Sequence, residues 1–277
     1  MAQPRILFGV GATKAGTGWL HDWLSSHPDC HFRGVKELHY FNTFHDGSVP
    51  RRIMSLEDER AAVAARGGAS ERIMALGDLI DAFRVGGDGA YLRYLSLQRV
   101  GEAVVGDVTP AYSLLPVARL QAMAALGDTR FLYVLRDPVA RLWSHVRMIA
   151  KRRDPNGRVT AERSARILKR TIQGKEEHIS VRSDYRSALE RLAAAIPEPQ
   201  RLTVFFEELF SGEGTRRISA FLGIAPHPPL ASVIHAGQPL AMTRAQDHAA
   251  RDFLADQYAY VTEALGPVPQ AWQPEKV

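Results

Sequence analysis

Two short segments, about 120 residues apart, carry residues suited to binding phosphate groups. The first, residues 9–19, reads Gly-Val-Gly-Ala-Thr-Lys-Ala-Gly-Thr-Gly-Trp and follows the apolar run 6–8. The second, residues 131–138, reads Phe-Leu-Tyr-Val-Leu-Arg-Asp-Pro, and Arg141 and Ser144 come shortly after it. Each predicts a strand that ends in a loop and continues into a helix, so each loop offers backbone N–H groups, hydroxyls and one cation. Two such loops suit one ligand that carries two separate phosphate groups.

The first loop does not fit the two commonest nucleotide-binding patterns. A Walker A loop reads Gly-x-x-x-x-Gly-Lys-Ser/Thr; Gly11 and Gly16 have its spacing, but Thr17 stands where the lysine belongs. The dinucleotide pattern Gly-x-Gly-x-x-Gly also fails, because Lys14 takes the place of its third glycine. The lysine of this loop therefore comes before the last glycines, unlike in either pattern.

The segment from Lys14 to Trp19 resembles the Lys-x-Gly-Thr-Thr/x loop of sulfotransferases that use 3′-phosphoadenosine 5′-phosphosulfate (PAPS). The resemblance implies that Lys14 contacts the bridging oxygen between sulfate and 5′-phosphate. It also implies that the N–H groups of residues 16–18 and the hydroxyl of Thr17 bind the 5′-phosphate, and that Trp19 stacks on the adenine. An ammonium and a helix N-terminus aimed at the leaving oxygen stabilise the transition state more than the ground state.

The second segment resembles the 3′-phosphate site of the same family. There an arginine follows a strand and a serine lies eight positions later, as Arg136 and Ser144 do here. A guanidinium offers phosphate a planar fork of donors. The alternative is a structural ion pair between Arg136 and Asp137, and Arg141 is either a supporting contact or a solvated helix residue. The donor-binding residues implied by the resemblance are Lys14, Ala15, Gly16, Thr17, Gly18, Trp19, Arg136, Ser144 and Tyr185.

A third segment, residues 36–41, is a candidate for the catalytic base. It reads Lys-Glu-Leu-His-Tyr-Phe and resembles the Lys-Glu-x-His-Phe-Phe-like segment of the carbohydrate branch, which includes heparan sulfate sulfotransferases. The resemblance implies that Glu37 deprotonates the acceptor hydroxyl, while His39 is the competing base because cytosolic members use a histidine. In a third interpretation both residues only cap and pair structurally. A carboxylate between Lys36 and His39 is expected to stay ionised at pH 7, as a base must be.

The acceptor side is implied by residues 109–112, Thr-Pro-Ala-Tyr, which resemble a Thr/Ser-Pro-x-Tyr segment that lies along the acceptor cleft in the same branch. For Tyr112 and Tyr185, plain core packing is the alternative. The catalytic residues implied are Glu37, Lys14 and His39, and the acceptor-binding residues are Lys36, Glu37, His39, Thr109 and Tyr112.

The elements that must position these residues alternate along the chain. Apolar runs predict strands at 5–10, 30–34, 103–107, 130–135 and 201–206, and amphipathic spacing predicts helices at 17–26, 116–126, 138–152, 184–195, 214–222 and 243–265. Such alternation predicts an α/β, P-loop-like fold of three layers, with a mostly parallel central sheet flanked by helices. Ligands of such sheets bind at the carboxyl ends of the strands, where both loops lie.

We expect a single domain over residues 1–277. It would contain a variable insert at 45–100, with a helix starting at Ser55 and short helices separated by paired glycines, and a basic, lid-like segment at 151–183. A glycine-rich cofactor loop near the C-terminus is not evident, since Ala236-Gly237-Gln238 is a poor substitute.

Composition adds weaker constraints. Lysine and arginine number 35 and acids 30, a net charge of +5 that fits an anionic ligand without requiring one. The single cysteine, Cys30, excludes an intrachain disulfide and is expected to be packed. The sequence contains no apolar run long enough for a membrane span and no signal region, so we expect a cytoplasmic protein that is complete at its N-terminus.

The sequence thus predicts a sulfotransferase that moves a sulfuryl group from PAPS to a hydroxyl, less readily an amine, of a sugar-containing or other small-metabolite acceptor by in-line displacement. No metal, nucleic acid or membrane partner is expected. The alternative is a nucleoside or sugar kinase with a degenerate phosphate loop, favoured by the Gly11/Gly16 spacing. A third is a nucleic-acid binder acting through residues 151–175, which contain nine basic and two acidic residues but no interleaved aromatics. The same run also fits a solvated helix face or a lid over an anionic acceptor, and the oligomeric state stays open.

Overall fold

A sheet of five parallel strands forms the centre of the computed structural model, which describes residues 3–230 and 240–273. Within these residues the strand order is β2-β3-β1-β4-β5, and each neighbouring pair is parallel. The predicted α/β fold with a parallel sheet is therefore confirmed. The strands are β1 (Arg5–Gly11), β2 (Cys30–His31), β3 (Val104–Val108), β4 (Thr129–Leu135) and β5 (Arg201–Phe205).

The central strand β1 lies between β3 and β4, which puts the ends of these three strands side by side. Phe8 is in register with Asp107 on β3 and with Phe131 on β4. At the carboxyl end of β1, a Cβ on Gly11 would lie 2.1 Å from the Tyr133 ring, so only glycine fits there. The loops that follow β1, β3 and β4 consequently leave the sheet at one edge.

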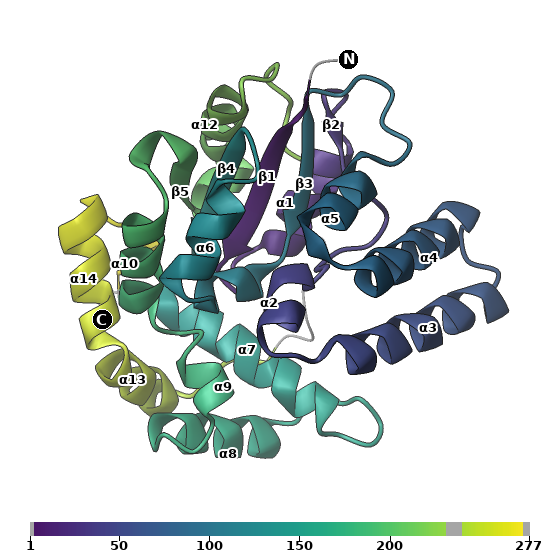
Figure 1. Cartoon of the computed structure of the whole chain (residues 1–277). Helices are drawn as coiled ribbons and strands as arrows, with labels where there is room; N and C mark the ends of the chain where they lie inside the picture. The colour runs from purple at the N-terminus through teal and green to yellow at the C-terminus, as the bar shows by residue number, and fades with distance from the viewer. Residues whose placement is uncertain (1–2, 231–239, 274–277) are drawn as a thin grey trace.

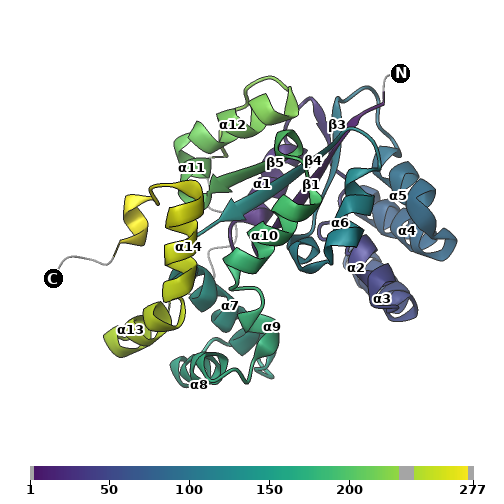
Figure 2. The same cartoon turned by 60° about the vertical axis from the view of Figure 1, so that its left-hand side comes forward.

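Helices cover both faces of the sheet, completing the predicted three layers (Figure 1). Figures 1 and 2 show α6 and α10 on one face and α1 and α12 on the other. The remaining helices lie at the carboxyl edge and at the sides. The helices of the core layers are α1 (Thr17–Ser25), α6 (Val117–Ala124), α7 (Pro138–Arg152), α10 (Tyr185–Ala195), α11 (Phe206–Ser211) and α12 (Glu213–Leu222).

Residues 40–96 form four helices beside the sheet, α2 (Tyr40–His45), α3 (Val49–Ala65), α4 (Ser70–Val85) and α5 (Gly87–Ser96). The prediction that a helix starts at Ser55 is wrong. Helix α3 begins at Val49, because Pro50 occupies its first turn, where a missing N–H costs nothing. The paired glycines do separate the helices, but α3 and α4 are 17 and 16 residues long rather than short.

The predicted helix at 243–265 is two helices, α13 (Arg244–Phe253) and α14 (Ala255–Leu265). The chain bends at Leu254, whose side chain is buried in a second apolar cluster. The bend lets α13 pack on α7 and α8 (Ala161–Ile172) while α14 packs on α10. The break therefore follows from tertiary packing, since no glycine or proline marks it.

The second apolar cluster lies under residues 151–183. It joins α7, α8 and the short α9 (Glu177–Ser180) through side chains that include Ile149, Ile167 and Ile179. One face of α8 is therefore packed, so this basic segment is not simply a solvated helix. Short 3₁₀ turns complete the described elements at Pro110–Leu114, Glu198–Gln200 and Gln270–Trp272.

Three sequence expectations have simple outcomes. Strand β2 is shorter than the predicted 30–34, and Arg33 just beyond it turns to pair with Asp78 of α4. Cys30 is buried, and burial raises the pKa of its thiol to about 12. Among the described residues, no helix combines the length and apolar character needed to cross a bilayer. The segment Ala236-Gly237-Gln238 lies outside the described residues.

Candidate active site

A cavity of about 840 Å³ lies at the carboxyl edge of the sheet. It brings together the first loop, the 36–39 segment, the cavity-facing side of α7 and the start of α11. Ten of the residues predicted from the sequence line it: Lys14, Gly16, Thr17, Gly18, Trp19, Lys36, Glu37, His39, Arg136 and Ser144.

The two phosphate-type loops meet in this cavity. Nη1 of Arg136 donates a hydrogen bond of 3.1 Å to the backbone carbonyl of Lys14, although the two residues are 122 positions apart. The Arg136 guanidinium also lies 4.7 Å from the centre of the Phe206 ring. The carboxylate of Asp137, by contrast, accepts from the N–H of Ala140 at the start of α7 and from the hydroxyl of Tyr258. Asp137 is thus a helix cap, and Arg136 faces the first loop.

The first loop makes a tight turn at the start of α1. Gly16 has a φ of +82°, and a Cβ there would lie 2.6 Å from the Phe206 ring, so glycine is required twice over. Helix α1 begins at Thr17, and the N–H groups of its first turn have no partners within the helix. Burial lowers the pKa of the Lys14 ammonium, and the positive charges of Lys36 and Arg136 lower it further.

Glu37 lies in the same cavity between two basic side chains. Its carboxylate oxygens are 3.8 Å from Lys36 Nζ and 3.5 Å from His39 Nε2. Burial acts to raise the pKa of Glu37, but the hydrogen bond with His39 and the positive charge of Lys36 outweigh it and hold that pKa below the ordinary value. The carboxylate is therefore ionised at neutral pH and able to accept a proton.

The backbone around Glu37 is held from behind by a buried carboxylate. Asp107, at the end of β3, accepts hydrogen bonds of 2.6 Å from both Thr109 Oγ1 and the Tyr112 hydroxyl. That hydroxyl accepts from the N–H of Tyr40, and Thr109 Oγ1 accepts from the N–H of His39. Thr109 and Tyr112 are fully buried and do not line the cavity. Both side chains hold the 37–40 loop, and their acceptor-binding role stays a prediction.

A second support for this loop is Arg52 of α3. Its Nη2 donates to the carbonyl of Glu37 at 3.0 Å and to that of Leu38 at 3.2 Å. Support is needed because Glu37 and His39 both have a φ of +57°, which is unfavourable for residues with a side chain. Neither Asp107 nor Arg52 was among the predicted site residues, since their contribution depends on contacts distant in sequence.

The model of the sulfotransferase family matches residues 4–229 of the chain. The chain belongs to the sulfotransferase family. Among solved structures it is similar to the sulfotransferase from Alicyclobacillus acidocaldarius, with 20% identity and a TM-score of 0.64 over 99% of this chain and 100% of that one. This likeness concerns the fold. The comparison with curated proteins gave no match. The family match includes both phosphate-type loops, the 36–41 segment and residues 109–112.

Two aromatic residues of this sulfotransferase lie differently from what the resemblance implies. Trp19 lines the cavity but is only 2% exposed, with its ring parallel to Trp23 and edge-on to Phe210. Tyr185, at the start of α10, is fully buried and outside the cavity lining; its hydroxyl donates to the carbonyl of Arg136 at 2.7 Å. Tyr185 thus holds the second loop from behind, and its side chain does not reach into the cavity.

Arg141 is a fully buried cation close to the second loop. It donates to Ser183 Oγ, while its Nε and Nη1 have no hydrogen-bond partner among the described residues. Burial lowers its pKa. The solvated alternative for Arg141 is therefore wrong. Ala15 is likewise buried and contributes only its backbone to the first loop.

Several lining residues of the sulfotransferase escaped the sequence analysis. Phe206 and Phe210 follow β5, so the rule that ligands bind at strand carboxyl ends would have found them. Arg147 and Arg152 lie three and eight positions after Ser144, a spacing that puts all three on one side of α7. His178 and Arg182 come from α9 and the turn after it, and no local pattern announces them. His145, Met148 and Ile149 complete this side of the lining.

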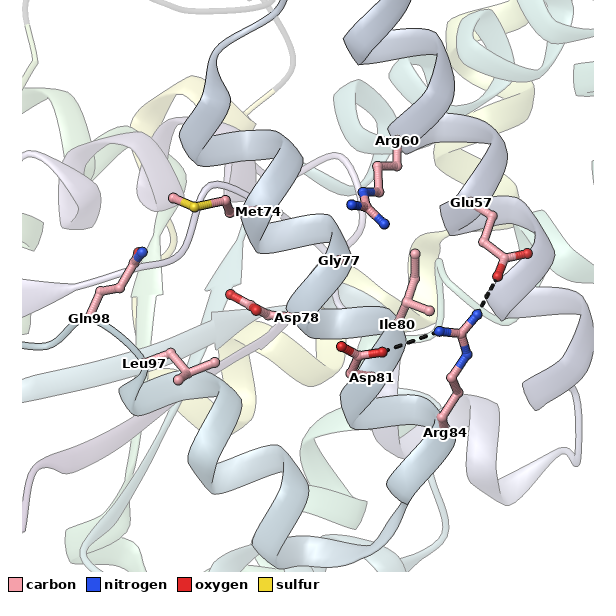
Figure 3. A pocket seen from close by; sticks show the side chains of 10 residues that line it. All are labelled: Glu57, Arg60, Met74, Gly77, Asp78, Ile80, Asp81, Arg84, Leu97 and Gln98. Carbon is pink, nitrogen blue, oxygen red and sulfur yellow. Dashed lines mark hydrogen bonds and ion pairs between the residues drawn. The ribbon is translucent and has the colours of Figure 1, made fainter.

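A second hollow lies far from these loops, between α3 and α4 (Figure 3). Its volume is about 410 Å³. Figure 3 shows Arg84 between two carboxylates, Glu57 at 2.6 Å and Asp81 at 3.2 Å. Asp78, on the same wall, pairs with Arg33. The charges of this hollow are largely satisfied within the protein.

Proposed function

We propose that the chain transfers a sulfuryl group from PAPS to a hydroxyl of a sugar-containing or other small-metabolite acceptor. The observation that carries the proposal is the hydrogen bond between Arg136 and the Lys14 carbonyl, since it puts both phosphate-type loops at one cavity with Glu37. A donor with phosphates at both ends requires two such loops in one place.

The residues present fit such a donor. The cradle at Gly16 has no room for a side chain, and the N-terminus of α1 opens into the cavity. The indole N–H of Trp19 is buried without a partner among the described residues. The donor supplies a sulfuryl group attached to a phosphate oxygen. We assign its 5′ end to the first loop and its 3′-phosphate to Arg136 and Ser144.

This assignment gives a role to several side chains at or behind the cavity wall. Glu37 accepts the proton of the acceptor hydroxyl as that oxygen bonds to sulfur. Lys14 stabilises the negative charge that develops on the leaving oxygen. Tyr185 fixes the backbone of Arg136, and Phe206 with Phe210 offers an apolar wall to the adenine. His39 holds the Glu37 carboxylate and is the competing base.

The donor is tested by thermal unfolding with adenosine 3′,5′-bisphosphate (PAP), the product. A ligand selective for the folded state stabilises it by about 2.7 kcal/mol at 100 times its Kd. We expect a clear rise in Tm with PAP and a smaller one with adenosine 5′-phosphate, which lacks the 3′-phosphate. No rise at millimolar PAP would refute the proposed donor.

The kinase alternative is tested in the same assay. The Gly11/Gly16 spacing favours it, and the lysine of the first loop stands outside the Walker position. A kinase would be stabilised by ATP only with magnesium and by PAP hardly at all. Transfer of labelled sulfate from PAPS to a panel of hydroxylated metabolites, detected by mass, then identifies the acceptor.

A further inference from the structure

Two groups of basic residues in the 151–183 segment differ in their surroundings. In the first group the charges are paired within the protein. Glu176 is buried and binds Arg153 and Arg170 at 2.8 Å each, and Asp154 binds Arg163. These pairs fasten the turns between α7, α8 and α9. They account for much of the basic run without a ligand, and so weaken the nucleic-acid interpretation.

In the second group the charges face the cavity. Arg152, at the end of α7, and Arg182, after α9, both line it. Nη1 of Arg182 donates to the carbonyl of His178 at 2.7 Å, which fixes the guanidinium at the cavity wall. Among the described lining residues, six are lysine or arginine and one, Glu37, is a carboxylate. The cavity is thus strongly cationic.

The cations of the cavity serve different ends of it. The charge of Arg147 acts on Lys14 and Arg136, whose pKa values it lowers, so Arg147 belongs with the donor loops. Arg152 and Arg182 both act on Glu37, and Arg182 acts on Arg141 and His145 as well. The charge of Arg152 helps to lower the Glu37 pKa, and the Glu37 carboxylate opposes the lowering that burial imposes on the Arg182 pKa. Arg152 and Arg182 thus line the same cavity as Glu37 and are coupled to its carboxylate, and we take this part of the cavity as the acceptor side.

The two arginines carry the same charge in one cavity lining, and after burial and the opposing charge of Glu37, the charge of Arg152 lowers the pKa of Arg182. Glu37 is the one carboxylate among the described lining residues, and Lys36 and His39 already contact it. Like charges held close on a cavity wall are unfavourable until an anion joins them. A neutral acceptor would leave that repulsion in place.

We infer that the acceptor carries an anionic group, a carboxylate, phosphate or sulfate, which Arg152 and Arg182 bind while Glu37 faces the hydroxyl to be sulfated. This inference rests on the proposed function, because it takes the Glu37 side of the cavity as the acceptor side. It narrows the acceptor class from hydroxylated metabolites in general to acidic ones.

The test uses pairs of acceptors that differ in one charge. One pair is 4-nitrophenyl β-D-glucuronide and 4-nitrophenyl β-D-glucoside, and the other is glucose 6-phosphate and glucose. Each compound is titrated calorimetrically into the full chain saturated with PAP, at fixed ionic strength, and assayed for sulfate transfer from labelled PAPS. In at least one pair we expect the charged member to bind tenfold or more tightly than the neutral one.

Two variants show whether these arginines are responsible. In the Arg152→Gln/Arg182→Gln double variant the preference should fall below threefold, with PAP affinity kept within threefold. Arg166→Gln is the matched control, because Arg166 lies on α8 outside the cavity lining and pairs with Glu162. That variant should keep the full preference. Thermal unfolding of both variants excludes loss of fold as the cause.

The inference is overturned if neutral members bind as well as charged ones, if no compound binds the PAP complex at 10 mM, or if the preference survives in the double variant. These outcomes differ from failure of the proposed function. That failure appears earlier, as an absence of PAP binding by the unmodified chain before any acceptor is added.

Discussion

The two hollows of this molecule handle charge in opposite ways. Between α3 and α4, Arg84 lies between Glu57 and Asp81, and Asp78 pairs with Arg33. At the carboxyl edge of the sheet, six cations line the cavity with Glu37 as the one carboxylate among the described lining residues. Charges that are paired within the protein leave little for a ligand to satisfy, whereas unbalanced charges favour a ligand that supplies the missing sign. The balance of charges therefore distinguishes the candidate site from the other hollow better than the presence of a hollow does.

The largest effect is expected from replacing Glu37, the carboxylate of the cationic cavity. We expect Glu37→Gln to lower kcat by roughly 10²–10⁴-fold, because an amide cannot accept the proton of the acceptor hydroxyl. PAP affinity, measured by titration calorimetry, should change little. His39→Ala should lower kcat less, since it removes a contact of the base and leaves the base itself. A near-normal kcat for Glu37→Gln would transfer the role to another group.

The donor end offers the next largest effect. We expect Arg136→Gln to weaken PAP binding by about 10–100-fold, the value of a charge-assisted hydrogen bond to phosphate. Binding of adenosine 5′-phosphate should be nearly unaffected, so the variant should abolish the preference for a 3′-phosphate. Arg130→Gln is the matched control, because Arg130 lies on β4 at the opposite end of the strand and pairs with Asp128. Equal losses for both nucleotides would show a general distortion of the loop.

The cationic cavity should also respond to acid through His145. Burial, followed by the charges of Arg141 and Arg182, lowers its pKa from 6.5 to about 2, so the folded state keeps this imidazole neutral. Between those values the unfolded chain binds the extra proton, and stability falls as pH falls below about 6.5. We expect His145 to account for a loss of about 2 kcal/mol between pH 7 and pH 5.

Urea unfolding of His145→Gln at the two pH values measures this contribution, since the pH dependence of the free energy of unfolding should become shallower. His178→Gln is the control, because His178 is exposed and should contribute less. An unchanged slope in His145→Gln would mean that other groups cause the acid sensitivity.

The smallest effect is expected in the paired hollow. Arg84→Gln removes two ion pairs, but all three side chains are largely exposed and such pairs are worth about 1 kcal/mol or less. We expect kcat, KM and PAP affinity to stay at their original values and the free energy of unfolding to fall by less than about 1 kcal/mol, as measured in urea. A loss of activity would show that this hollow belongs to the site after all.

The parts of the site that are continuous in sequence were the predictable ones. The residue spacing of the loop at Lys14 and of the segment at Arg136 can be recognised in a single sequence. The alternation of strands and helices predicts that both lie at the carboxyl edge of the sheet. The structure brings them together, while their donor-binding roles stay predictions. The direction of a buried hydroxyl was not predictable: Tyr112 and Tyr185 could equally have lined the cavity, and packing turned both toward backbone groups behind it.

Features that depend on tertiary packing were hidden for the same reason. The bend at Leu254 carries no glycine or proline, because a buried contact sets it. Arg153 and Arg182 look alike in the sequence, yet one is bound to Glu176 and the other lines the cavity. The packing of α8 and α9 onto α7 decides which of the two arginines pairs with a carboxylate and which lines the cavity.

The contact between Arg136 and the Lys14 carbonyl also has a consequence for biosynthesis. It joins residues 122 positions apart, so the first phosphate-type loop leaves the ribosome long before the second. Until β4 has been added beside β1, no nascent chain has both phosphate-type loops in place, so the proposed donor should not rescue a stalled or truncated product. The proposed donor would thus act only on the finished chain, where its binding should slow unfolding and lengthen the lifetime of the folded state.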